Sequence, residues 1–141
     1  MPQWIEVLLS TPDCPHSPLG RYTQANGFLY LALGFVIYAW PGVMGLVGAA
    51  PLVGQEPALY RLIGFAIAII GYLYVFGGRT NRESFGLATF LDRILVPLFI
   101  VPLVVAGQVD AMLVLPVAIL DPILGIGAFV IWKRQSSSRR P

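Results

Sequence analysis

A carboxylate stands in the middle of an apolar segment of this chain. Asp121 lies within VAILDPILG, residues 117–125, near the centre of a run from Ala111 to Trp132 that is long enough to cross a membrane. An unpaired carboxylate at that depth costs several kcal/mol, so we expect Asp121 to be protonated, paired or facing water. Its functional interpretation is a proton-relay or ligand-binding acid.

Local satisfaction of the same carboxyl is the structural alternative. Pro122 cannot donate to the carbonyl of Ala118, and a protonated Asp121 could donate to that freed oxygen. Tyr38 and Tyr72 fall at comparable depth in other predicted spans and are the other candidate partners. We expect no basic residue at this depth, and one acid without a second charged group makes a poor transport pathway. Both interpretations stay open.

A second set of charged residues lies in and after a polar hinge, GGRTNRESFG, residues 77–86. Arginine clusters at a membrane interface bind anionic lipid headgroups or acidic patches on partner proteins. The candidate headgroup or partner-binding residues are Arg79, Arg82, Asp92 and Arg93. For Arg79 and Arg82 we favour a simpler role, which is to set the topology and form surface ion pairs.

Asp92 and Arg93 lie deeper than the other two. If their helix begins near Ser84, they lie about two turns inside it, about 12 Å along the axis. There they would be half-buried and would need partners such as Arg79 or Glu83. For this pair we favour the binding role.

Other arrangements that carry chemistry are weak. Asp110 precedes the apolar run AMLVLP and predicts a helix N-cap. The stretch DCPH, residues 13–16, contains the only cysteine and the only histidine, so we expect no metal site and no catalytic residue. No nucleotide-binding loop or haem site is present, so no cofactor and no nucleic-acid partner is predicted. A lipid, quinone or pigment in the helix grooves stays open.

The composition predicts an integral membrane protein. Hydrophobic residues make up 57% of the 141 residues, and charged residues only 11%. Soluble domains average about 25% charged residues, because their surface must be hydrated. The length allows one domain, whose main solvent is the lipid bilayer.

Four membrane spans are predicted, so the fold class is an all-α transmembrane four-helix bundle. The spans cover about 27–47, 60–77, 84–106 and 111–132, within a transmembrane domain of residues 21–134, and the third starts at Ser84 or only after Arg93. Pro41 and Gly42 predict a kink or an early end near Trp40. Residues 1–20 form an N-terminal segment that contains either a short interfacial helix or a loosely ordered tail. Its prolines predict extended chain over 11–20, and residues 135–141 form a basic tail.

The distribution of basic residues predicts the orientation. An even number of spans places both termini and the middle hinge on one side, which then holds eight of the nine basic residues and leaves only Arg61 on the other. Basic residues accumulate on the cytoplasmic side, so both termini are expected to be cytoplasmic.

Small residues and prolines shape the predicted helices. Gly64, Ala68 and Gly71 recur at helical spacing, which predicts close approach of another helix backbone. Prolines inside the third and fourth spans should bend both and free carbonyls that need partners; they are Pro97, Pro102, Pro116 and Pro122.

The layout of residues 21–134, four short spans with compact loops and an arginine-bearing hinge, resembles small bacterial inner-membrane proteins of the DoxX-like kind. The resemblance is one of layout and carries over no functional residue. Near absence of catalytic groups favours a non-enzymatic accessory or scaffolding subunit that packs against other integral membrane proteins or against itself. The alternatives are an oligomeric transporter or channel-like protein in which Asp121 titrates, and a membrane enzyme on an apolar substrate with Asp121 as acid or base. In the enzyme, Asp92 and Arg93 would orient a headgroup.

Overall fold

The structure is a computed structural model, and it describes residues 16–138. Over this range the chain is helical and contains no strand; its elements are α2 (Pro18–Ala39), the 3-10 helix η1 (Pro41–Val47), α3 (Glu56–Arg79), α4 (Glu83–Val105) and α5 (Ala111–Ser137). Three of these helices, α3, α4 and α5, are long and apolar enough to cross a membrane, and α2 with η1 makes a fourth if the bent pair is one span. These helices indicate an integral membrane protein.

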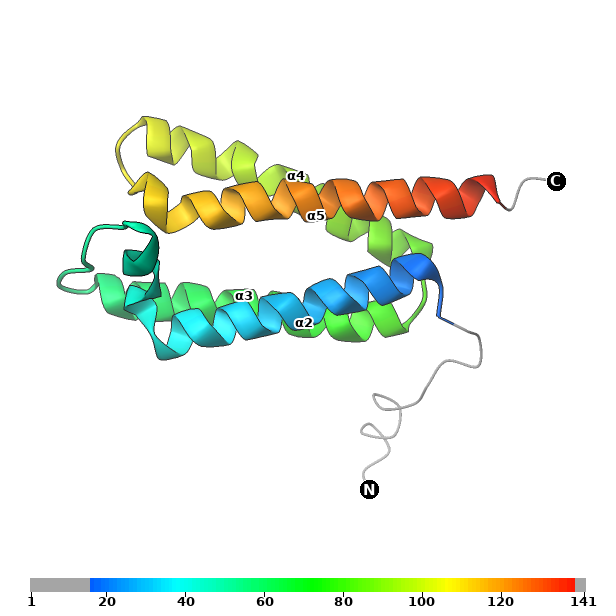
Figure 1. Cartoon of the computed structure of the whole chain (residues 1–141), viewed down its shortest axis with the longest axis horizontal. Coiled ribbons are helices and arrows are strands. Elements are labelled where there is room, and N and C mark those ends of the chain that lie inside the picture. The colour runs from blue at the N-terminus through cyan, green and yellow to red at the C-terminus, as the bar shows by residue number, and fades with distance from the viewer. Residues whose placement is uncertain (1–15, 139–141) are drawn as a thin grey trace, which may run out of the picture.

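Two antiparallel helix hairpins make up the bundle (Figure 1). Helices α2 and α3 form the first hairpin, and α4 and α5 form the second. The start of α2, the α3–α4 turn and the end of α5 lie together at one end, which we call the terminal end. At the opposite end lie η1 and the α4–α5 turn, and we call it the loop end.

Paired glycines bring α2 and α3 into backbone contact. The pairs are Gly20 with Gly78, Gly27 with Gly71, and Gly34 with Gly64, so the glycines recur every seventh residue on both helices. A Cβ atom on any of the six would lie within 2.9 Å of the partner's carbonyl oxygen, closer than real side chains approach. The close approach predicted from Gly64, Ala68 and Gly71 is confirmed, and its matching series on α2 is a further finding.

The first helix differs from its predicted span. It begins at Pro18 instead of about residue 27, because Ser17 caps its first turn by accepting from Gly20 N at 3.0 Å and Pro18 takes the first helical position. The prediction of extended chain up to residue 20 is therefore wrong for its last three residues, because a proline is tolerated in the first turn. The early end near Trp40 is confirmed: α2 stops at Ala39, and η1 turns away by 102°.

The other helices lie near their predicted spans but run longer in two cases. Helix α3 begins at Glu56 instead of residue 60. Helix α4 begins at Glu83, in agreement with the earlier of the two predicted starts. Helix α5 continues to Ser137, so part of the predicted basic tail is helical. The predicted interfacial helix and the DCPH stretch up to residue 15 lie outside the described residues.

The Asp110 N-cap is confirmed. Its carboxylate accepts from Met112 N at 2.9 Å and also from Ala50 N at 3.1 Å. These two backbone hydrogen bonds, the one from Ala50 foremost, hold the pKa of the carboxyl below its ordinary value. Asp110 therefore both starts α5 and ties it to the loop after η1.

Candidate functional site

A buried arginine occupies the centre of the bundle. Arg93 of α4 is 1% exposed, and its guanidinium carbon lies 4.8 Å from the ring centre of Tyr74 and 5.4 Å from that of Tyr30. Both distances fall within the range of cation–π attraction. Within residues 16–138, none of its three guanidinium nitrogens has a hydrogen-bond partner. The two aromatic faces are therefore its main surroundings.

Gly125 provides the space for this side chain. A Cβ atom at that position would lie 3.3 Å from the Cβ of Arg93, so any larger residue would press on the arginine. Gly125 lies one helical turn after Asp121 on α5, which places both on the face that looks toward α4. Helix α5 thus leaves space for the Arg93 side chain next to Asp121.

Asp121 is paired with a tyrosine of the first hairpin. The carboxyl is 4% exposed, and the Tyr30 hydroxyl donates to its Oδ1. Arg93 and Asp92 act on the same carboxyl electrostatically. The expected partners Tyr38 and Tyr72 are wrong: they are 48% and 44% exposed and lie on outward helix faces. Tyr38 also lies eight residues beyond Tyr30, about 12 Å farther along α2, so its expected depth is wrong as well as its direction.

The expectation that no basic residue reaches the depth of Asp121 is also wrong. Arg93 lies ten residues into α4, about 15 Å from its start at 1.5 Å per residue. Its long side chain and its packing against Gly125 carry the charge to the level of the acid. The objection that Asp121 lacks a second charged group is therefore removed.

Asp92 has a different partner and a different exposure from those expected. The Tyr74 hydroxyl donates to its Oδ2 at 2.5 Å, whereas Arg79 and Glu83 had been the expected partners. Asp92 itself is exposed on α4, while Arg93 is fully buried, so the prediction that both are half-buried is wrong for each. Successive residues of a helix point about 100° apart, which separates the two environments.

We name Tyr30, Tyr74, Asp92, Arg93 and Asp121 the central cluster. It draws one or two residues from each of the four long helices, and each tyrosine donates to one aspartate while its ring lies against the arginine. The rings of Tyr30 and Tyr74 also meet edge to face, with centres 5.6 Å apart. The arrangement brings one guanidinium and two aspartates together through the two tyrosines.

Three of the five site residues chosen from the sequence therefore come together, and two do not. Arg79 ends α3 and Arg82 precedes α4, so both lie in the turn at the terminal end, away from the central cluster. Tyr30 and Tyr74 were missed, because aromatic residues in membrane helices usually pack. One signal was present: Tyr60 and Tyr74 are fourteen residues apart and share a helix face.

Tyrosine hydroxyls also join the hairpins away from the cluster. Tyr22 of α2 donates to the carbonyl of Leu124 at 3.1 Å, and Tyr60 of α3 donates to that of Leu113 at 2.8 Å. With Tyr30 and Tyr74, four tyrosines of the first hairpin donate to the second.

Comparison of the chain with known protein families, curated proteins and solved structures finds no match.

Proposed function

We propose that this protein is a proton-coupled membrane transport protein that works through the central cluster, acting as an oligomer. The observation that carries the proposal is Arg93, buried to 1% exposure between two tyrosines that each hold a different aspartate. Charges inside a membrane bundle are costly and mark ion pathways or relays more often than simple packing. An apolar residue of similar volume would fill the same space at no such cost.

The chemistry follows from which groups can change charge. The guanidinium stays positive at every accessible pH, so it is a fixed charge. Asp121 is the exchangeable group, and it accepts a hydrogen bond from Tyr30 of the other hairpin, as Asp92 does from Tyr74. Protonation of Asp121 weakens the Tyr30–Asp121 contact and leaves Arg93 less compensated. Proton binding thereby changes the free energy of the contact between the hairpins, which is the event that a rocking transporter requires.

The proposal includes the location. The terminal end faces the cytoplasm of a bacterial cell, and the membrane is the inner membrane, because seven of the nine basic residues lie on that side of the predicted topology once the buried Arg93 is left out.

Proton flux in reconstituted vesicles tests the proposal. The purified protein is placed in liposomes loaded with a pH-sensitive dye, and a potassium gradient with valinomycin drives protons inward. The expected result is uptake by the natural protein and its loss in Asp121→Asn, which keeps the shape but cannot titrate. Asp110→Asn is the matched control, because Asp110 is a cap at the loop end and should keep full uptake. Equal uptake by Asp121→Asn and the natural protein would refute the proposal.

A second candidate function is an accessory subunit of a larger membrane complex. The observation that favours it is the outer surface of α4: only 11% of the residues in its most apolar stretch are buried, against 33% for α3. A helix with so little contact in its own chain can pack against another membrane protein. Native mass spectrometry after gentle extraction tests this function. Co-migration with other membrane proteins at fixed stoichiometry supports it, and a monomer or homo-oligomer alone contradicts it.

A further inference from the structure

Two buried polar side chains on α2 lie between the terminal end and the central cluster. Thr23 is 1% exposed and Asn26 is 5% exposed. Thr23 Oγ1 and Asn26 Nδ2 have no hydrogen-bond partner among the described residues. They precede Tyr30 by seven and four residues, so all three lie on one face of α2. These groups line a single stripe that ends at the cluster.

Unpartnered polar atoms at this depth need a partner. A hydroxyl or amide that leaves water without a new hydrogen bond costs several kcal/mol in hydrocarbon, so helices in membranes satisfy such groups with protein or with water. The guanidinium nitrogens of Arg93 have the same need. Buried waters typically bridge groups of this kind.

The opposite side of the cluster is apolar. Seven residues beyond Tyr30, the same stripe of α2 carries Ile37, which is 2% exposed and belongs to a cluster with Ile67 and Tyr60. Leu33 and Leu113 pack against that cluster. The Tyr60 hydroxyl donates to the carbonyl of Leu113, so it has a hydrogen-bond partner within the protein. Water therefore has polar groups to bind on the terminal side of Tyr30 and few on the loop side.

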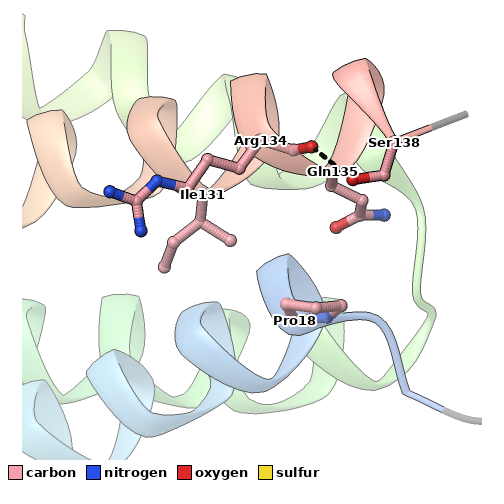
Figure 2. Close-up of a pocket in the computed structure, with 5 residues that line it drawn as sticks. All are labelled: Pro18, Ile131, Arg134, Gln135 and Ser138. Atoms are coloured by element: carbon pink, nitrogen blue, oxygen red, sulfur yellow. Dashed lines mark hydrogen bonds between the residues drawn. The ribbon is translucent and has the colours of Figure 1, made fainter. Parts of the chain in front are cut away.

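A cavity opens at the terminal end, beside the first residue of α2. It has a volume of about 530 Å³ and lies between α2 and α5, with Pro18 on one side and Ile131, Arg134, Gln135 and Ser138 on the other. Figure 2 shows Ile131 and Gln135 projecting from α5 toward Pro18. Pro18 precedes Thr23 by five residues, about 7.5 Å along α2.

We propose that Thr23 and Asn26 form a one-sided water pathway that connects the terminal end with Arg93 and Asp121. Water enters by the cavity at Pro18, is held by the Thr23 hydroxyl and the Asn26 amide, and reaches the guanidinium. The loop side stays dry. The pathway supplies the central cluster with protons from one side only, and in that respect the inference rests on the proposed function.

Thiol accessibility tests the pathway without any need for transport. Thr23→Cys and Asn26→Cys are made in a Cys14→Ser background, since Cys14 is the only native cysteine. Membrane vesicles of known sidedness are treated with a small, charged, membrane-impermeant methanethiosulfonate, which reacts only with thiols in water. Ile37→Cys is the matched control, because Thr23 and Ile37 are equally far from Tyr30 and equally buried.

The expected result is modification of Thr23→Cys and Asn26→Cys at least tenfold faster than Ile37→Cys, from the side of the terminal end. Equal rates at residues 23 and 37, or faster reaction from the loop side, would overturn the proposal. Loss of proton uptake in Asp121→Asn with no labelling at 23 and 26 would leave the proposed function standing and remove the pathway. Labelling at residues 23 and 26 without proton uptake by the natural protein would support the pathway and refute the proposed function.

A second measurement keeps the proposal testable if the cysteine variants fail to fold. Thr23→Val has the shape of threonine without its hydroxyl. In a dry environment this change removes an unsatisfied group and should raise the melting temperature, whereas in a hydrated one it removes a water-binding group and should lower it. A lowered melting temperature is expected, and a raised one would refute the pathway.

Discussion

Removal of the Tyr30 hydroxyl tests the central cluster most directly. Tyr30→Phe keeps the ring beside the Arg93 guanidinium but takes away the donor to Asp121 Oδ1. Asp121 is 4% exposed, and the Tyr30 hydroxyl is the hydrogen-bond donor that the described residues give its carboxyl. A hydrogen bond to a charged group contributes about 1.5–3 kcal/mol, so we expect the variant to lose about 2 kcal/mol of stability. That loss is about a 30-fold change in the unfolding equilibrium.

The assay is reversible unfolding in mixed micelles, followed by circular dichroism as the denaturing detergent is increased. Tyr72→Phe is the matched control, because Tyr72 is 44% exposed on the outer face of α3 and should change stability little. In an Asp121→Asn background, Tyr30→Phe should cost less than about 1 kcal/mol, because the acceptor is then neutral. If Tyr30→Phe is as stable as Tyr72→Phe, or costs the same in both backgrounds, the pairing of Tyr30 with Asp121 is refuted.

Three further predictions concern separate parts of the molecule. Gly71→Ala should destabilise the protein by about 1–3 kcal/mol, because the new methyl would lie 2.7 Å from the Gly27 carbonyl oxygen, whereas Gly45→Ala, with no atom within 4 Å, should be neutral in the same unfolding assay. The stability that Asp110 contributes should be complete above its ordinary pKa of 3.8 and lost as pH falls through its lower folded-state pKa. In melting temperatures measured over a series of pH values, Asp110→Asn should therefore reduce the loss of stability at acid pH. An unchanged loss would contradict the cap. Arg93→Met should keep the fold in circular dichroism but abolish proton uptake, and retained uptake would show that the charge is not used.

The sequence predicted the helical class because that class depends on composition and local pattern. Long uncharged runs predict membrane helices whatever their neighbours are. Asp110 predicts the start of a helix because it directly precedes an apolar run. The break at Trp40 was predicted for the same local reason, since Pro41 cannot continue the preceding helix.

What could not be predicted depended on which faces meet. Asp121, Arg93 and Asp92 were recognised as unusual residues, but their partners are set by the rotation of each helix about its axis. Tyr38 and Tyr72 point outward, and Tyr38 also lies about 12 Å farther along α2 than Tyr30. The packing of Arg93 against Gly125 also requires the crossing of α4 and α5, which no single segment encodes.

The start of α2 was missed for a different reason. The prolines of residues 11–20 favour extended chain, but a proline directly after a capping serine occupies the first position of a helix, as Pro18 does here. Had Ser17–Pro18 been taken as a start signal, the series Gly20, Gly27 and Gly34 would have stood inside one helix. Its sevenfold repeat would then have matched Gly64, Gly71 and Gly78.

The first hairpin is held by backbone contacts of its own, whereas tyrosine hydroxyls join it to the second hairpin, and this difference has a consequence for biosynthesis. The first hairpin is closed by backbone contact at three glycine pairs, all of which lie in the first 79 residues and need nothing from the rest of the chain. It can therefore complete its packing in the membrane while the second hairpin is still being synthesised. The acceptors of its four tyrosine hydroxyls, at residues 22, 30, 60 and 74, lie on α4 and α5, which are synthesised later. Biogenesis thus becomes a docking reaction between a finished half and a newly inserted one, in which the order of synthesis follows the order of assembly.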